Sequence, residues 1–363
     1  MKSARGLVMG PAPYVFSRQS TATWTWGTAL ALVPAFIWGL YCFGAGAALP
    51  VVASVLAALV GEAGVGLFRK RITLGDGSAA LTGFLVGLAM PPSIPLYIPA
   101  ASALFAIIMI KGIFGGIGSN WMNPALGGIV FALLNWPRQM GEWVVPRHLA
   151  GVVGVSGATP LGFVRDRLGA APAGSDPLSL LAAAGMKFSD LDRSIREALN
   201  FLLFSRIGAD LPAGYIDLLI GNRPGALGEI SGILILAASV FLLSRRIIRW
   251  EIPASVMFSY ALIVWVFGGL PYGNGFFAGD VLFAILSGSF LIVTFFMAPD
   301  PVTSPSTRTG MLAYGFGIAV LTFLIRSYGA MSEGTAFAVL TMNCLVPLIT
   351  GGRAARPARL GRD

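Results

Sequence analysis

The chain has 363 residues, of which 56% are hydrophobic and 11% charged, and its mean hydropathy is +0.78. Soluble domains carry about a quarter charged residues, so this composition excludes one or two soluble domains and predicts that lipid covers most of the surface. The net charge of +9 does not indicate nucleic-acid binding, because Lys and Arg lie at the ends of apolar runs, as at Arg69 to Arg71, the positive-inside pattern of membrane proteins.

Ten apolar segments follow one another along the chain, and each predicts a membrane helix. The segments are 22–41, 44–67, 76–90, 95–111, 122–135, 226–244, 252–270, 279–298, 310–326 and 333–350. Several are short or interrupted by Gly or Pro, which indicates broken or tilted helices that line a cavity. The predicted fold is an all-α polytopic membrane protein of about ten transmembrane helices.

The basic residues between these segments set the predicted topology. Residues 1–21 form a cytoplasmic N-terminal segment, 22–135 a first membrane repeat, 136–225 a large extracytoplasmic loop, 226–350 a second membrane repeat and 351–363 a basic cytoplasmic tail. With both termini inside, most short outer loops carry little positive charge apart from Arg326, as the positive-inside rule requires. Within the long loop, Leu191 to Ile207 has the pattern of an amphipathic helix on the membrane surface.

A sequence likeness between the two halves predicts inverted repeats of about five helices each. Gly75-Asp76 opens a run that ends LTGFLVGLAMPP, and Gly279-Asp280 opens one that ends LSGSFLIVTFFMAPDP. The first Gly-Asp pair is predicted to be cytoplasmic and the second extracytoplasmic, an arrangement that places a pathway at the bilayer midplane. A chance likeness between two apolar helices is the alternative.

Few side chains in this chain can bind a metal or carry electrons. Cys42 and Cys344 are the two cysteines and His148 is the one histidine. A disulfide framework, an iron–sulfur cluster built by this chain alone and a bis-histidine haem are therefore excluded, and no metal site is predicted. If the chain handles electrons, an organic cofactor must carry them.

Six sequence blocks, in order and at family-like spacing, carry a resemblance to a known family. They are DGSAALTGFLVGLAMPP (76–92), KGIFGGIGSNWMNPALGG (111–128), VSGATPL (155–161), GNRPGALGEIS (221–231), MAPDPVTSPST (297–307) and GTAFAVLTMNCLVPLI (334–349). The chain resembles the D subunits of Rnf ion-translocating oxidoreductase complexes and the related B subunits of sodium-pumping NADH:quinone reductases. No single block is specific by itself.

The resemblance implies a covalent FMN at the SGAT segment, which on its own reads as a polar turn. In the family, the threonine of SGAT holds the 5′-phosphate of FMN through a phosphoester made by a separate flavin transferase. That assigns the attachment to Thr159, with Ser156, Gly157 and Ala158 beside it. A β-hydroxyl is the required acceptor, and the small residues before Thr159 leave room for the transferase.

The resemblance also implies a second, noncovalent flavin, riboflavin, at Asn120 and Asn123. These two amides are three residues apart and are predicted to share one helix face; hydrogen bonding between helices is the alternative use of such buried amides. Asp300 is a candidate for an ion path, although termination of a helix before Pro301 explains it equally well. Phe290 and Phe295 are candidates for a hydrophobic constriction, with core or lipid packing as the alternative.

Asp76, Glu62 and Asp280 are predicted near span ends, from where their side chains reach water. The resemblance implies an electron-carrier subunit of a ferredoxin:NAD oxidoreductase-type translocase in the bacterial inner membrane, without catalytic residues of its own. Electron transfer would be coupled to movement of Na⁺ or H⁺, with the other Rnf subunits as partners, one of them a second covalent-flavin subunit. The alternatives are a B-type subunit of the quinone reductase and a flavin-free channel or transporter.

Overall fold

The computed structural model describes residues 20–70, 74–147, 156–167, 175–183, 186, 188–204, 208, 210–329, 331 and 333–350. Most of the predicted N-terminal segment, the whole basic tail and His148 lie outside the described residues. The described chain is predominantly helical, and its β structure is one antiparallel pair, β1 (Trp143–Val144) with β2 (Ser156–Gly157), in which Trp143 lies opposite Gly157.

The first half contains five apolar helices. They are α1 (Thr21–Phe43), α2 (Ala48–Arg69), α3 (Ser78–Leu88), α4 (Tyr97–Phe105), which continues as the π-helical η3 (Ala106–Gly112), and α5 (Pro124–Asn135). The chain then forms α6 (Pro137–Gly141), β1, β2, α8 (Pro160–Arg167), α9 (Pro177–Ala183), α10 (Asp190–Leu202) and α11 (Tyr215–Ile220).

The second half also contains long helices and one broken helix. It contains α12 (Gly232–Ser244), α13 (Glu251–Phe267), α14 (Val281–Leu286), α15 (Phe290–Ile292), the π-helical η6 (Val293–Met297), α16 (Arg308–Tyr328) and α17 (Thr335–Ile349). Each of the ten predicted apolar segments is therefore helical over most of its length. The segment predicted at 279–298 is interrupted at Ser287 to Ser289, where Gly288 has a φ of +66°.

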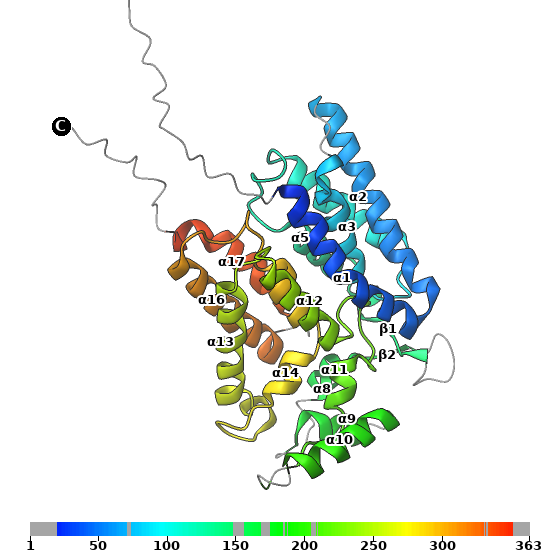
Figure 1. Ribbon diagram of the computed structural model, residues 1–363, viewed down its shortest axis with the longest axis vertical. Coiled ribbons are helices and arrows are strands. Elements are labelled where there is room, and N and C mark those ends of the chain that lie inside the picture. Colours follow the sequence, from blue (N-terminus) through cyan, green and yellow to red (C-terminus); the bar gives the residue numbers. More distant parts are fainter. Residues whose placement is uncertain are drawn as a thin grey trace, which may run out of the picture.

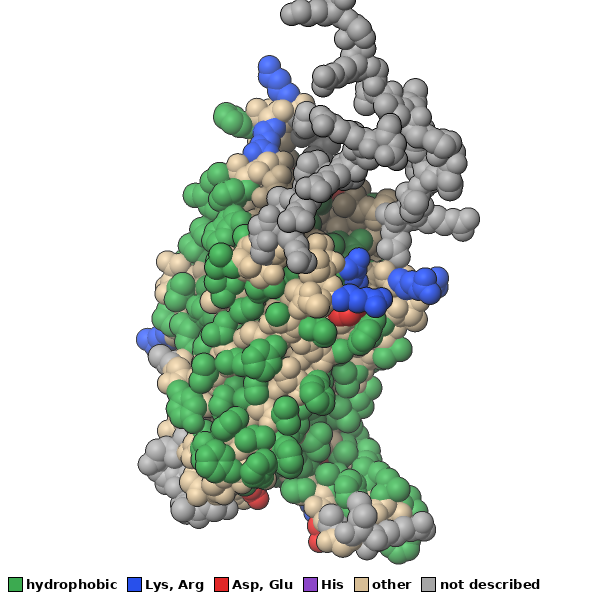
Figure 2. Space-filling view, turned by 90° about the vertical axis from the view of Figure 1, so that its left-hand side faces the viewer, with side chains coloured by type: hydrophobic (Ala, Val, Ile, Leu, Met, Phe, Trp, Pro, Cys, Tyr) green, Lys and Arg blue, Asp and Glu red, His purple; other side chains and the backbone are tan. Residues whose placement is uncertain are grey.

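Four helices of the described residues are long and apolar enough to cross a bilayer: Thr21–Phe43, Ala45–Arg69, Glu251–Tyr272 and Arg308–Tyr328. The shorter apolar helices pack among them; α2 contacts α3 and α4, while α13 and α17 contact α16. Large apolar side chains point outward, for example Phe68 and Phe258, which are 92% and 73% exposed. Figure 2 shows hydrophobic side chains over most of the face that it presents. This surface fits a multi-pass membrane protein.

The two halves meet through two pairs of helices, α1 with α12 and α5 with α17. The start of α1 and the end of α17 lie toward one end of the molecule, which we call the terminal side; α8 to α11 lie at the opposite end, the loop side (Figure 1). Asp76 lies on the terminal side, where its carbonyl accepts from Thr25 Oγ1 at 2.6 Å. Asp280 lies on the loop side, where its carboxylate accepts from Tyr215 Oη at 2.7 Å.

Helix α10 begins at a serine N-cap, because Ser189 Oγ accepts from Asp192 N at 3.1 Å. Its charged residues alternate with apolar ones at helical spacing, and Leu191 and Phe201 are exposed. The helical part of the predicted amphipathic segment is thus confirmed, with bounds Asp190–Leu202.

Candidate functional site

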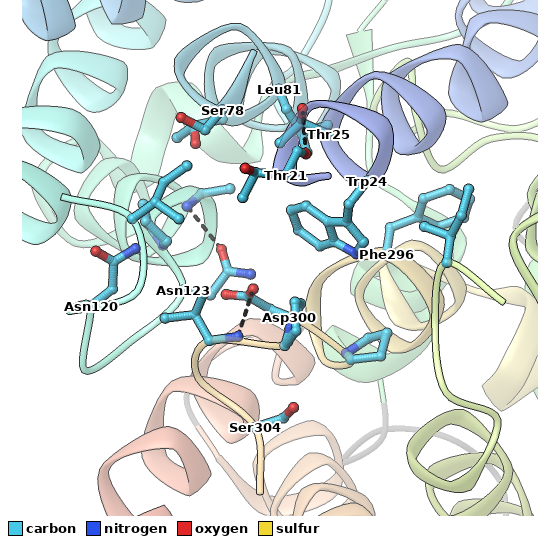
Figure 3. A pocket seen from close by; sticks show the side chains of 18 of the residues that line it. Thr21, Trp24, Thr25, Ser78, Leu81, Asn120, Asn123, Phe296, Asp300 and Ser304 are labelled. Carbon is cyan, nitrogen blue, oxygen red and sulfur yellow. Dashed lines mark hydrogen bonds between the residues drawn. The ribbon is translucent and has the colours of Figure 1, made fainter. Parts of the chain in front are cut away.

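A cavity of about 460 Å³ opens between the two halves on the terminal side. Its walls come from the start of α1, the first turns of α3, the segment before α5, the turn between α12 and α13, and the segment after η6. We call it the large cavity. Figure 3 shows Asn120, Asn123 and Asp300 around it, together with Trp24 and Phe296. Three of the residues predicted from sequence are therefore brought together, although Asp300 is far from the two asparagines along the chain.

Asn123 has a structural role that fixes its side chain. Its Oδ1 accepts from the backbone N–H groups of Ala125 and Leu126 at 2.9 and 3.3 Å, which makes it the N-cap of α5, and Pro124 follows at the first helical position. An asparagine cap followed by proline is a strong helix start. Its Nδ2 donates to the carbonyl oxygen of Met297 at 3.0 Å. Both ends of the amide are thus used by the protein.

Asn120 lies in the irregular segment between η3 and α5, so the prediction that both asparagines share one helix face is wrong. The physical reason is that Gly115, Gly116 and Gly118 adopt positive φ values and keep this segment out of a helix. The Oδ1 atom of Asn120 is buried and has no hydrogen-bond partner in the part of the chain that the structure describes. A buried acceptor without a partner is costly, so Asn120 is the amide that has a free bond to offer a ligand.

Asp300 lies in the connection between η6 and α16, and it is 5% exposed. Its carboxylate accepts from the backbone N–H of Val302 at 3.3 Å and from Thr303 Oγ1 at 3.1 Å. Burial raises the pKa of Asp300 to about 6, against the lowering effect of these two hydrogen bonds. The large cavity therefore has one wall whose charge changes close to neutral pH.

A buried ion pair that sequence reasoning missed stands beside the large cavity. Lys111 Nζ lies 2.8 Å from Glu62 Oε2 and donates to Ser78 Oγ at 2.6 Å, and both charged side chains are at most 5% exposed. The prediction that Glu62 reaches water is therefore wrong, because Lys111 from η3 meets it inside the helix bundle. The signal available in the sequence was a charge of each sign inside two apolar runs, 44–67 and 95–111.

The SGAT segment lies on the loop side and does not line the large cavity. Ser156 and Gly157 form β2, Ala158 is exposed and Thr159 is 4% exposed. Thr159 Oγ1 accepts from the backbone N–H of Gly162 at 3.1 Å, so this threonine caps the first turn of α8. The side chain of Ser156 lies outside the described residues.

Phe290 and Phe295 are both buried in the broken helix that ends in η6, at 0% and 8% exposure. The Phe290 ring stacks on Tyr260 with 4.3 Å between centroids, and the guanidinium of Arg326 lies over it at 5.7 Å. Phe296, one residue beyond Phe295, lines the large cavity. The structure thus places both predicted phenylalanines in the interior, close in sequence to the cavity wall.

Comparison with known proteins gives the family. The model of the NQR2, RnfD, RnfE family matches residues 8–359. The chain belongs to this family. It is 33% identical over 351 residues to the D subunit of the proton-translocating ferredoxin:NAD(+) oxidoreductase complex of Clostridium ljungdahlii, covering 96% of this chain and 95% of the relative. It is 36% identical over 344 residues to the D subunit of the ion-translocating oxidoreductase complex of Stutzerimonas stutzeri, covering 92% and 90%.

Membership of the NQR2, RnfD, RnfE family thus extends over nearly the whole chain, as the resemblance of the six blocks predicted. The D subunit of the ion-translocating oxidoreductase complex of Halorhodospira halophila is 34% identical over 325 residues. These matches cover both helical halves, the large cavity and the SGAT segment together. The family assignment therefore applies to every part of the chain whose geometry is described above.

Proposed function

We propose that this protein is the D-type membrane subunit of an ion-translocating ferredoxin:NAD oxidoreductase complex, in which it relays electrons while Na⁺ or H⁺ moves. The observation that carries the proposal is the match to a D-type relative over more than nine-tenths of both chains. Such a subunit carries flavin and binds neither ferredoxin nor NAD itself. Its partners are the other subunits of the complex, including a second subunit with covalent flavin.

Thr159 is the proposed attachment site of FMN, through a phosphoester to the 5′-phosphate. Its hydroxyl stands at the start of α8, where the N–H of Gly162 points toward it at 3.1 Å. The N-terminus of a helix favours a phosphate because its N–H groups and its dipole both attract negative charge. When bound, the flavin supplies the electron-transfer chemistry. The role of the protein is to hold the phosphate and to fix the position of α8 through the contact of Arg165 with the Gly329 carbonyl.

The burial of Thr159 has a consequence for maturation. At 4% exposure, the hydroxyl is not accessible to a transferase in the described arrangement. We therefore propose that attachment precedes the final packing of α8, while the SGAT segment is still open to the extracytoplasmic side.

The large cavity is the proposed site of noncovalent riboflavin. Its volume of about 460 Å³ falls in the range of small-molecule sites, and the unpartnered Oδ1 of Asn120 can accept from an N–H of the flavin ring. Asn123 shapes the same wall from its position at the cap of α5. Trp24 and Phe296 supply flat apolar surface, and aromatic rings favour stacked or edge contacts with another ring.

The membrane arrangement we propose is two inverted repeats, α1 to α5 and α12 to α17, in a bacterial inner membrane. The pairing of α1 with α12 and of α5 with α17 supports it, because equivalent helices meet at a two-fold axis. The positions of Asp76 and Asp280 at opposite ends of the molecule support it as well. The terminal side would face the cytoplasm, and residues 136–225 would be extracytoplasmic.

The mass of the tryptic peptide that contains Thr159 tests the attachment directly. The peptide from the native host is expected to carry the added mass of FMN, and a denaturing gel is expected to show a fluorescent band under ultraviolet light. Thr159→Ala should remove both signals, whereas Ser156→Ala, three residues away in the same segment, should keep them. Fluorescence that survives in Thr159→Ala would place the bond elsewhere.

A cysteine scan tests the orientation. In a Cys344→Ala background, which removes the exposed native thiol, cysteine at Ala158 should react with a membrane-impermeant reagent added to intact spheroplasts. Cysteine at Ser20, at the opposite end, should react only after lysis. The reverse pattern would invert the proposed topology.

A further inference from the structure

A second, much smaller cavity lies deeper in the protein, between the large cavity and the loop side. Its volume is about 30 Å³, which is room for about one water molecule or one small cation. Its polar lining consists of Glu229, Ser289 and Glu333, and its apolar lining includes Trp143 of β1 and Met140 of α6. We call it the small cavity.

The carboxylates of this cavity come from two separate connections. Glu229 belongs to the segment between α11 and α12 and is 5% exposed; its Oε1 accepts from Ala226 N at 3.2 Å. Glu333 belongs to the connection between α16 and α17, and its Oε2 accepts from the N–H and the hydroxyl of Ser289 at 3.1 and 2.6 Å. Oε1 of Glu333 is buried and has no hydrogen-bond partner among the described residues.

Two arginines balance the two carboxylates. Arg326 Nη2 lies 3.8 Å from Glu333 Oε2, and Arg223 Nη2 donates to the backbone carbonyl of Glu229 at 2.8 Å. The Nε atoms of both arginines are also buried without a partner in the described part of the chain. Buried polar atoms are normally paired with protein, water or an ion. The unpaired Oε1 of Glu333, which lines the small cavity, is an acceptor and can bind a cation or a water molecule. The two Nε–H groups are donors, which a water molecule can satisfy and a cation cannot.

One thin wall separates the small cavity from the large one. Within η6, Phe296 lines the large cavity while Val293 and Met297 line the small one. The wall is a π-helix, a form that is frequent at functional sites. Thr294, between these residues, is fully buried and its hydroxyl has no partner among the described residues.

On the basis of the function proposed above, we infer that the small cavity is a station of the coupled cation, with the carboxylates of Glu229 and Glu333 as its oxygen ligands. The cation would arrive from the large cavity past η6 and leave on the loop side. Arg223 and Arg326 make the empty network neutral, so an added cation is held weakly. An ion path requires this property, because a tightly bound ion does not leave.

Gly288 supports the same assignment. A Cβ on this glycine would collide with Glu333 Oε1 and would lie 2.9 Å from Arg326 Nη2. Its φ of +66° is in the left-handed region that glycine adopts without strain. The break between α14 and α15 therefore brings backbone, carboxylate and guanidinium together at the place where the cation would pass.

The test uses the whole complex in sealed proteoliposomes, driven by reduced ferredoxin and NAD. Translocated cation per NADH formed is measured with radioactive sodium in one arm and with an internal pH dye in the other. Glu229→Gln and Glu333→Gln are expected to lose the translocated cation in whichever arm the wild type is active. Glu142→Gln is the matched control, because that glutamate is on the loop side, 56% exposed and paired with Arg138 on the surface. A wild-type ratio in either buried variant would overturn the inference.

A second pair of variants tests the inference if the glutamine variants do not assemble into the complex. Glu229→Asp and Glu333→Asp keep the charge and shorten the reach by one methylene, so the cation concentration for half-maximal translocation should rise. An unchanged half-maximal concentration in both would overturn the inference. In-gel fluorescence of each variant reports the covalent flavin separately. Absence of in-gel fluorescence in the wild type would refute the attachment at Thr159. It would leave the conclusion about the two glutamates unaffected.

Discussion

The side-chain amide of Asn123 donates to the carbonyl oxygen of Met297 across 3.0 Å, joining the start of α5 in the first half to the end of η6 in the second. The same asparagine caps α5 through its Oδ1. One side chain thus holds the segment before α5 and the broken helix of the other half in register, at the wall of the large cavity.

Replacement of the two asparagines by alanine should separate structure from binding. Asn123→Ala removes a helix cap worth about 1 kcal/mol and leaves the Met297 carbonyl buried without a donor, a further cost of about 1–3 kcal/mol. Asn120→Ala removes an acceptor that no described residue uses. Thermal unfolding in detergent should therefore shift down for Asn123→Ala only, while noncovalent flavin, extracted and measured by fluorescence, should fall in Asn120→Ala. Equal melting shifts would contradict this division.

Removal of Lys111 should be more damaging than removal of the whole ion pair. Lys111→Met removes the cation that faces the buried carboxylate of Glu62, and breaking a buried ion pair costs about 3–5 kcal/mol. The double variant Lys111→Met/Glu62→Gln removes both charges and should recover most of that loss. The measurement is the yield and melting temperature of the purified protein for the wild type and the two variants. A double variant no more stable than Lys111→Met would show that the pair is not the source of the effect.

Glycine at position 87 permits the close approach of α3 to α2. A Cβ there would lie 2.6 Å from the Cα of Val51 and would collide with Ser54 Oγ. Backbone cannot yield as a flexible side chain does, so Gly87→Ala should destabilise by about 1–3 kcal/mol. Gly64→Ala is the matched control in α2, because nothing lies within 4 Å of its added Cβ, and it should leave stability unchanged or slightly raised. The measurement is the unfolding curve of each variant, compared with that of the wild type.

Serine in place of Thr159 should preserve both roles of the hydroxyl. Ser caps helices as well as Thr does, and it offers the same β-hydroxyl to the flavin phosphate. Thr159→Ser is therefore expected to give a fluorescent band in a denaturing gel, and Thr159→Val, which keeps the volume, is expected to give none. A band in the valine variant would exclude Thr159 as the attachment site.

The helices could be predicted from sequence because a bilayer span has a simple requirement, a long apolar run. The start of α5 could also have been predicted, since Asn123-Pro124 is a helix-capping signature. Asn123 was instead assigned to a helix face. The wider environment could not be predicted. Glu62 meets Lys111 across 49 positions, and Glu333 meets Ser289 across 44. Spacing along one helix contains no information about such partners, which depend on how separate helices pack.

The large cavity shows the same limit. Asn120 and Asp300 were each identified as candidates, but for different roles, and nothing in their local patterns indicates that they line one space. The attachment segment is the opposite case. Thr159 was found by its resemblance to a family motif, and its position at the cap of α8 adds a physical reason for that residue type.

The hydrogen bond from Gly228 N to the Leu88 carbonyl, 2.9 Å long, has a bearing on how the protein is made. Leu88 is the last residue of α3, and Gly228 is synthesised only after the whole long loop. While the nascent chain is inserted, the carbonyl group of Leu88 lacks this hydrogen-bond donor. The interior of a bilayer offers few other donors. This contact therefore favours an order of biogenesis in which the insertion machinery retains the first half until the second half has been synthesised.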